Sequence, residues 1–213
     1  MLVNVGCGPF PTPGYVNFDN SPSLLLGRVP GLVPFLKRVG VLASSQAQMA
    51  DVANQTDVRW ADVRKRIPLP DSSARVVYSC HMLEHLSRDE ARSFLREAKR
   101  VLRPGGRLRI AVPNLRYFVD RYLESGDADS FVDGLLLSPP STSSLLARTR
   151  FLLVGNRHHQ HMYDARSLKQ LLSAAGFADA IEVDPGTTTI PEPGALDLTE
   201  RAGQSIYVEA LRP

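Results

Sequence analysis

The sequence predicts an α/β fold built on a doubly wound sheet. Three observations support this prediction. The chain has 213 residues with 43% apolar content, which is enough for one domain with a full core. Strand-like runs alternate with helical patterns along the sequence. Residues 76–113 show the alternation most clearly, because a strand, a helix and a second strand follow one another directly.

The unit at residues 76–113 has strong local signals. Val76-Val77-Tyr78 favours a strand, and Ser87 is a typical N-cap for the helix that follows. Apolar residues recur there at helical spacing, at Ala91, Phe94, Leu95, Ala98, Val101 and Leu102. Pro104-Gly105-Gly106 is expected to end the helix in a hard turn, and alternating apolar residues over 107–112 predict the next strand.

Seven strands are expected in all, near residues 2–6, 15–19, 57–61, 75–80, 107–112, 180–184 and 204–210. Two further helices are expected over residues 115–125 and from Asp164 to Ala175. Only Pro9–Gly14 separate the first two strands, which is too short for the usual crossover helix. That helix is therefore expected to be reduced or missing. Part of one sheet face would then be bare, which favours a homodimer.

Two segments are expected to cover the acceptor side of a single domain that spans residues 1–213. Residues 21–50 are apolar but contain Pro30 and Pro34, which predicts short helices. Residues 115–156 combine a helix with two apolar stretches, 131–137 and 143–154.

Composition excludes several classes of protein. No apolar run is long enough to span a bilayer, and the first predicted strand begins at Leu2, so neither a membrane span nor a signal peptide is expected. Cys7 and Cys80 lie at predicted strand ends and suit a reduced, cytoplasmic protein. The net charge is only +3, and the basic run Arg64-Lys65-Arg66 lacks interleaved aromatics, so nucleic acid is a disfavoured partner.

Several motifs together resemble class I S-adenosylmethionine (SAM)-dependent methyltransferases, in particular the group with an EHL…VLRPGG signature. They occur in the family's order: Gly6 and Gly8, Asp19, Asp62, Glu84-His85 and Arg103–Gly106. The likeness covers residues 2–113 well and the rest more loosely. It implies a Rossmann-like, mostly parallel seven-stranded sheet whose last strand is reversed, and SAM as the cofactor.

The predicted cofactor site follows the first strands. Gly6-Cys7-Gly8 would let the backbone approach the amino-acid part of SAM, and Asp19-Asn20 would accept the ribose hydroxyls. The resemblance implies that Asp62 binds the adenine amino group, that Val63 lies beside the ring, and that Cys80 and His81 complete the set. The alternative is that Asp19-Asn20 starts a turn and Asp62 caps a helix. A dinucleotide site is excluded, because the prolines after Gly8 lack the amide donors that phosphate needs.

A second cluster, His81-x-x-Glu84-His85, follows the fourth predicted strand, at the edge where open α/β sheets bind ligands. These residues share one face if the chain enters a helical turn there. Some methyltransferases of the ubiquinone pathway and of small-RNA ends carry Glu-x-x-Glu-His here and bind Mg²⁺. The resemblance makes Mg²⁺ or Mn²⁺ a candidate cofactor. His81 replaces the first glutamate, which disfavours Mg²⁺ and leaves Mn²⁺, Zn²⁺ or no metal open.

A third cluster spans residues 157–164 and holds three of the five histidines of the chain. It resembles an H-x-W-x-Y-D stretch of related methyltransferases, with His161 in place of the tryptophan. His159 is a candidate general base or a fourth metal ligand, beside His81, Glu84 and His85. The alternative is a histidine-rich surface loop.

The expected function is SAM-dependent O-methylation of a small hydroxylated metabolite, with a sugar or oligosaccharide hydroxyl as the leading acceptor. His85 and His159 are the candidate bases or ligands, and Glu84 would orient or coordinate. Two alternatives remain: an RNA-directed O-methyltransferase and a non-catalytic SAM-binding scaffold protein.

Overall fold

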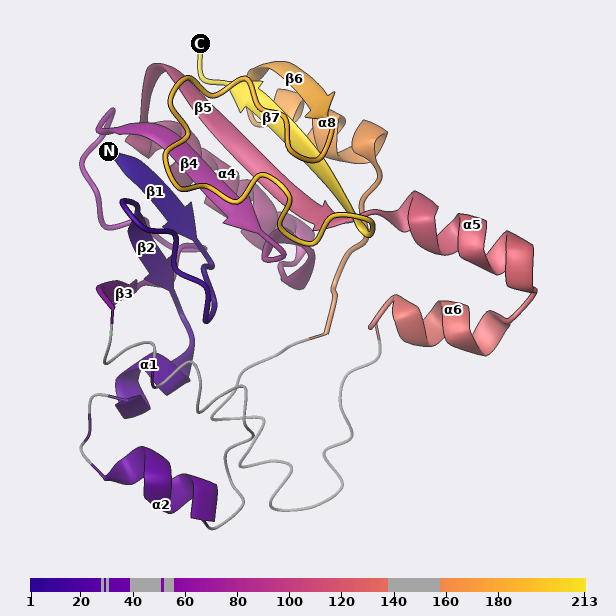
Figure 1. The fold of residues 1–213 in the computed structure, drawn as a ribbon. Coiled ribbons are helices and arrows are strands. Elements are labelled where there is room, and N and C mark those ends of the chain that lie inside the picture. The colour runs from indigo at the N-terminus through magenta and orange to yellow at the C-terminus, as the bar shows by residue number, and fades with distance from the viewer. Residues whose placement is uncertain (28, 30, 39–50, 52–55, 138–157) are drawn as a thin grey trace.

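A computed structural model describes residues 1–27, 29, 31–38, 51, 56–137 and 158–213 (Figure 1). Its centre is a seven-stranded sheet in the order β3-β2-β1-β4-β5-β7-β6. The strands are β1 (Leu2–Val5), β2 (Val16–Asp19), β3 (Val58–Trp60), β4 (Ala74–Cys80), β5 (Leu102–Pro113), β6 (Ala178–Val183) and β7 (Ser205–Leu211). β7 runs antiparallel to both of its neighbours, and the other pairs are parallel. The predicted fold and all seven strands are confirmed.

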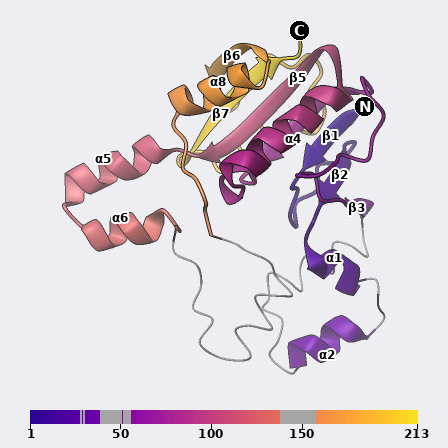
Figure 2. The same cartoon turned by 180° about the vertical axis from the view of Figure 1, so that it is seen from behind.

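Two helices cover one face of this sheet, α4 (Arg88–Val101) and α8 (Ala165–Ala174) (Figure 2). Ser87 and Asp164 cap them, and each forms a reciprocal capping box with the third helical residue. The main core lies between this face and the apolar sides of the two helices, with Phe94, Leu95, Leu168 and Leu172 fully buried.

The remaining helices lie toward the carboxyl ends of the parallel strands. They are α1 (Pro22–Gly27), α2 (Leu32–Arg38), the short 3₁₀ helix η1 (Leu83–His85), α5 (Leu115–Ser125) and α6 (Ala128–Gly134). The short helices expected within residues 21–50 are present as α1 and α2, and residues 39–50 lie outside the described residues. α5 and α6 extend away from the end of β5 (Figure 1). The apolar stretch predicted at 143–154 also lies outside the described residues.

The expectation of a bare sheet face is wrong. Residues 184–204, the strap, connect β6 to β7 and cross the opposite face of the sheet (Figure 1). Ile190 and Leu196 of the strap are buried against Tyr78 of β4 and Tyr207 of β7. The strap thus provides the cover that helices would otherwise give. The expected bare face was the reason for predicting a homodimer, and the strap covers that face.

A buried ion pair holds the strap to the sheet. Arg109 of β5 donates to Glu209 Oε1 of β7 at 2.6 Å and to the Thr187 carbonyl at 2.9 Å. Glu209 also accepts from the Thr188 hydroxyl at 2.6 Å and the Thr189 N–H at 2.7 Å. Both charged side chains are 0% exposed. Such a pair is stable only while both charges are matched and hydrogen-bonded, so the strap and the sheet depend on each other.

The connection between β1 and β2 contains no helix, as predicted. Two buried asparagines hold this connection in place through hydrogen bonds with Thr12. Asn4 donates to the Thr12 hydroxyl at 2.9 Å, and Asn17 accepts from the Thr12 N–H at 2.8 Å and donates to its carbonyl at 3.1 Å. These side-chain bonds satisfy backbone groups that a helix would have paired internally.

The segment Pro104–Gly106 differs from its prediction. β5 starts at Leu102, directly after α4, and includes these residues instead of being separated from the helix by them. Gly105 N–H donates to the Arg212 carbonyl at 2.9 Å, and Arg212 N–H donates to the Gly106 carbonyl at 2.9 Å. The carboxyl-terminal end of the chain therefore pairs with this segment as a strand, a contact that local sequence does not reveal.

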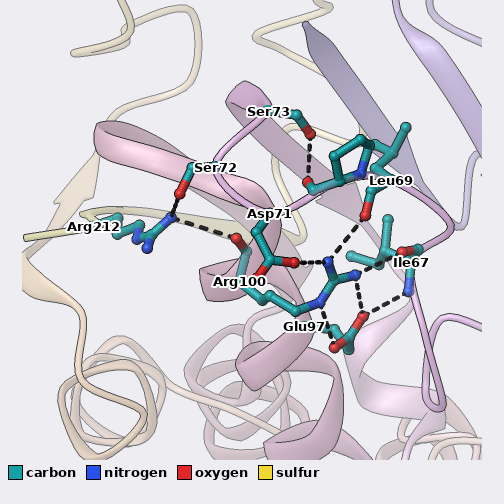
Figure 3. Close-up of polar contacts among 9 residues, drawn as sticks. Ile67, Leu69, Asp71, Ser72, Ser73, Glu97, Arg100 and Arg212 are labelled. Carbon is teal, nitrogen blue, oxygen red and sulfur yellow. Dashed lines mark hydrogen bonds and ion pairs between the residues drawn. The ribbon is translucent and has the colours of Figure 1, made fainter.

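Arg100 ties α4 to the loop that precedes β4 (Figure 3). Its guanidinium donates to the carbonyls of Ile67 at 2.8 Å and Leu69 at 3.0 Å, and it pairs with the carboxylates of Glu97 and Asp71. The hydrogen bond from Arg100 lowers the pKa of Glu97 against the opposing effect of burial. One side chain thus satisfies two loop carbonyls and two acids.

Among the helices of the described residues, none is both long enough and apolar enough to cross a membrane.

Replacing Arg109 by Met should lower the free energy of unfolding by about 3–5 kcal/mol, because Glu209 would stay buried without its cation. Equilibrium urea unfolding followed by circular dichroism measures the loss. Arg59→Met is the matched control, since its pair with Asp57 is 53% and 80% exposed and contributes at most about 1 kcal/mol. Arg109→Lys keeps the positive charge, so its free energy of unfolding should fall less than that of Arg109→Met. Equal losses for Arg109→Met and Arg59→Met would contradict the role given to the buried pair.

Arg100→Met should lower the free energy of unfolding by about 1–3 kcal/mol, because the two loop carbonyls lose their donor. Arg96→Met on the same helix, which removes a bond to Ser93, should change the free energy of unfolding little.

The pKa of Glu97 is lowered in the folded state, so its share of the stability is present above about pH 4.5 and is lost as pH falls through the folded pKa. In a pH series of urea unfolding curves, the difference in the free energy of unfolding between Arg100→Met and the parent should therefore decrease below about pH 4.5. A constant difference would contradict this assignment.

Candidate functional site

The carboxyl ends of the parallel strands bring the predicted site residues to one edge of the sheet. Val5 of β1 pairs with Phe18 of β2, and Asn4 pairs with Tyr78 of β4. The chain leaves each of these strands at the same edge. The Gly6–Gly8 turn, Asp19 and residues 81–85 therefore follow neighbouring strands.

The first turn and the acid of β2 are in direct contact. Gly8 N–H donates to Asp19 Oδ2 at 2.9 Å, and Ser21 N–H donates to Oδ1 at 2.7 Å. Gly6 and Gly8 both have positive φ, at 71° and 53°. A Cβ on Gly6 would meet Met82 Cγ at 2.6 Å, whereas nothing lies within 4 Å of the Cβ position of Gly8. Gly6 is thus required by the protein's own packing, and Gly8 leaves open space beside a carboxylate.

The third strand places Asp62 next to this pair. Ala61 N–H donates to the Asp19 carbonyl at 3.0 Å. Arg64 binds both oxygens of Asp62, at 2.7 and 3.0 Å, and this hydrogen bonding lowers the pKa of Asp62 despite its partial burial. Asp62 and the 45% exposed Trp60 line an open hollow of about 320 Å³, while Val63 is buried in the main core.

The other residues predicted to bind the cofactor differ in exposure. Cys7 and Cys80 are buried, and burial raises the pKa of both thiols, so they are not thiolate nucleophiles. Asn20 is exposed beside Asp19. His81 has a positive φ of 49°, which is uncommon for a residue with a side chain. Backbone strain of this kind at the end of β4 re-aims the chain into η1.

Glu84 is the buried centre of the second cluster. Its side chain is 1% exposed, and neither oxygen accepts a hydrogen bond from the described residues. Burial raises the pKa of Glu84 to about 8. Its backbone carbonyl accepts the N–H groups of Gln160 at 2.7 Å and His161 at 3.2 Å. Those bonds bring residues 158–161 against η1.

Three imidazoles surround the carboxylate of Glu84. Oε1 lies 3.4 Å from His81 Nδ1, 4.0 Å from His85 Nε2 and 4.0 Å from His159 Nε2. One ligand atom each from Glu84, His85 and His159 lies within 4.8 Å of the others. His81 is not part of this group of three, and its contact with the group is the one between its Nδ1 and Glu84 Oε1. Burial lowers the pKa of His81 to about 3 and that of His159 to about 4, so both rings are neutral near pH 7.

The second nitrogen of each ring contacts an oxygen on its outer side. His85 Nδ1 lies 3.1 Å from the His158 carbonyl, and His159 Nδ1 lies 2.9 Å from the Leu135 carbonyl. His81 Nε2 lies 2.7 Å from Ser205 Oγ. These contacts fix the orientation of all three rings.

Sequence reasoning missed the residues that hold these rings. Ser205 and Arg201 come from the end of the strap and the start of β7, and Arg201 Nη1 lies 3.5 Å from His81 Nδ1. Leu135 follows α6 and reaches His159 from the predicted acceptor-covering segment. No local pattern marks these positions, because each acts through a contact across the fold.

A family model described as a methyltransferase domain matches residues 37–110, which include Asp62, Glu84 and the segment Pro104–Gly106. A Mycolicibacterium smegmatis protein, named as an S-adenosylmethionine-dependent methyltransferase, is 30% identical over 173 residues, which are 80% of this chain and 53% of that protein. The chain thus spans about half the length of this relative.

A 27-O-demethylrifamycin SV methyltransferase from Amycolatopsis mediterranei is 39% identical over 66 residues, which are 31% of this chain and 23% of that enzyme.

Among solved structures, a SAM-dependent methyltransferase from Thermotoga maritima superposes with a TM-score of 0.53 at 17% identity, covering 99% of this chain and 81% of that one. At this identity the likeness supports the fold alone. The sheet order, with its reversed β7, agrees with it. The matched methyltransferase domain, the M. smegmatis relative and the fold together support a class I S-adenosylmethionine-dependent methyltransferase, a family whose cofactor is SAM.

Proposed function

We propose that the chain transfers the methyl group of SAM to a hydroxyl of a small hydroxylated acceptor, with a sugar or oligosaccharide as the leading acceptor class. The observation that carries this proposal is the position of the Glu84, His85 and His159 group, at the same sheet edge as the Gly8–Asp19 contact. This edge therefore carries both a backbone turn that leaves space for a ligand and a group of side chains that can accept a proton.

The residues present fit the cofactor. Gly8 has open space where a side chain would stand, and the carboxylate of Asp19 lies beside it. Asp19 accepts the Gly8 N–H through Oδ2 and the Ser21 N–H through Oδ1, and a carboxylate in this position is of the type that accepts vicinal ribose hydroxyls. Asp62 would contact adenine from the hollow beside Trp60, with its carboxylate already oriented by Arg64. SAM supplies an activated methyl group, and the residues of the chain would hold that group in place for transfer.

Transfer to oxygen requires a proton acceptor near the acceptor hydroxyl. The Nε2 atoms of His85 and His159 face the interior of the cluster, and their Nδ1 atoms are held by carbonyls. Either ring can take a proton through Nε2. Glu84, with Oε1 4.0 Å from both Nε2 atoms, would orient the two rings. Holding the acceptor in line with the methyl group supplies the rest of the rate enhancement.

The O-methyl assignment also has support among the relatives, because one of them is named for methylation at an oxygen. The acceptor-covering segment around α5 and α6 reaches the cluster through Leu135. The carbohydrate acceptor, the homodimer, the single domain and the cytoplasmic location stay predictions.

Two variants should separate cofactor binding from catalysis. Asp19→Ala should weaken the binding of SAM and of S-adenosylhomocysteine about 10- to 100-fold, because a charge-assisted acceptor is lost. His159→Ala should bind both as the parent does and lose about 10²- to 10⁴-fold in turnover. Titration calorimetry measures the first effect. A methyl-release assay over sugar, phenol and RNA acceptors, with and without a chelator, measures the second.

Arg92→Ala is the matched control, since its pair with Asp89 on α4 lies at the surface, with side chains 58% and 93% exposed. Unchanged SAM affinity in Asp19→Ala would contradict the assigned cofactor site. A parent protein that binds SAM but methylates none of the acceptors would favour the scaffold alternative. Methylation confined to RNA would favour the RNA-directed alternative.

A further inference from the structure

The carboxylate of Glu84 is buried beside three imidazole rings. The described residues give neither of its oxygens a hydrogen bond, although the side chain is 1% exposed. A buried carboxylate without a hydrogen-bond partner is strongly disfavoured, so this site is a candidate for binding a cation. Imidazole nitrogens of His81, His85 and His159 lie 3.4, 4.0 and 4.0 Å from Oε1.

The backbone fixes which nitrogen of each ring carries the proton. A carbonyl oxygen can only accept, so the contacts to the His158 and Leu135 carbonyls require N–H groups at Nδ1 of His85 and His159. In the neutral rings, Nε2 then bears the lone pair, and in both rings it lies 4.0 Å from Glu84 Oε1. Arg201 beside His81 Nδ1 favours a lone pair there as well.

We propose that Glu84, His85 and His159 bind one first-row transition-metal ion of the Zn²⁺ type, with His81 beside the site. Ligands about 2.1 Å from a tetrahedral ion are roughly 3.4 Å apart. Glu84 Oε1 lies 4.0 Å from both Nε2 atoms, and one ligand atom of each residue lies within 4.8 Å of the others, so modest side-chain movements would reach that geometry. Imidazoles whose outer N–H groups bind carbonyls are the usual arrangement of metal-binding histidines.

The donor set selects against Mg²⁺. Magnesium prefers six oxygen ligands at close to octahedral geometry, and this cluster offers one carboxylate against two or three nitrogens. Imidazole nitrogen suits zinc and its neighbours in the first transition row. Sites with three protein ligands keep a position open for substrate.

The binding of the ion depends only on the cluster, whereas its role rests on the proposed function. A bound cation at this edge would lower the pKa of an acceptor hydroxyl that reaches the open position. His85 and His159 would then be ligands, so the proton of that hydroxyl would pass to solvent water as the oxygen attacks the methyl carbon, and the carbon–sulfur bond would break to release S-adenosylhomocysteine. His81, in contact with Ser205 at the end of the strap, would close the far side of the site.

The experiment uses the full chain, stripped of metal with a chelator and titrated with Co²⁺ as a spectroscopic probe. One Co²⁺ per chain should give intense visible absorption bands typical of tetrahedral coordination, and one equivalent of Zn²⁺ should abolish them. Millimolar Mg²⁺ should leave them unchanged. Glu84→Gln and His159→Ala should each weaken Co²⁺ binding at least about 100-fold.

His161→Ala is the matched control, because this ring lies two residues from His159 and packs on Tyr163 instead of the cluster, with ring centres 4.6 Å apart. It should bind Co²⁺ as the parent does. Circular dichroism of each metal-free variant checks folding, and Glu84→Gln is nearly isosteric in case His159→Ala fails to fold. Absence of Co²⁺ binding, equal competition by Mg²⁺, or equal loss in His161→Ala would overturn the proposal.

Calorimetry with SAM on the metal-free protein separates the two proposals. SAM binding and methyl transfer without any Co²⁺ or Zn²⁺ binding would overturn the metal site and leave the proposed function intact. Metal binding by a protein that methylates no acceptor would support the metal site and overturn the proposed function.

Discussion

Parallel pairing of β3, β2, β1, β4 and β5 is the constraint on which the rest of the structure depends. Parallel strands must all leave the sheet at one edge, so residues far apart in the sequence converge there without any contact of their own. The Gly8–Asp19 hydrogen bond and the Glu84 cluster both result from this convergence. The buried faces of the sheet keep the register rigid, with α4 and α8 on one face and the strap on the other.

Polar groups rather than helices complete the second face of the sheet. The strap has no helix or strand of its own, and it is held by Arg109, Glu209 and the hydroxyls of Tyr78 and Tyr207, both of which bind Glu200. The β1–β2 connection uses Asn4 and Asn17 in the same way. In both places the backbone polar groups are satisfied by side chains from the sheet, which replaces the internal pairing of a helix.

Periodicity and capping residues were enough to predict all seven strands, α4, α5 and α8, because those signals are local. Ser87 and Asp164 both act as the N-caps that the sequence indicates. The strap could not be predicted, since its anchor joins Arg109 to a residue 100 positions away and its sequence has no period. The start of β5 was missed for a similar reason: Gly105 pairs with Arg212 at the far end of the chain.

The candidate site was predictable in its residue types and less so in its contacts. The spacing of His81, Glu84 and His85 indicated a shared face, and η1 provides the turn that this needs. The proximity of His159 to Glu84 rested on resemblance, because it depends on bonds across the fold, such as those from Gln160 and His161 to the Glu84 carbonyl. Arg64, in the basic run Arg64-Lys65-Arg66, binds the carboxylate of Asp62, a contact that the charge of the run does not reveal.

Trp60 gives the molecule a built-in optical probe. It is the single tryptophan of the chain, and it stands half exposed at the rim of the hollow that Asp62 also lines. Indole emission depends on solvent contact and on stacking with other rings, so the entire tryptophan fluorescence of this chain originates at the side of the sheet where we propose that adenine binds. Occupancy of that side can be followed in the unlabelled protein by its intrinsic fluorescence.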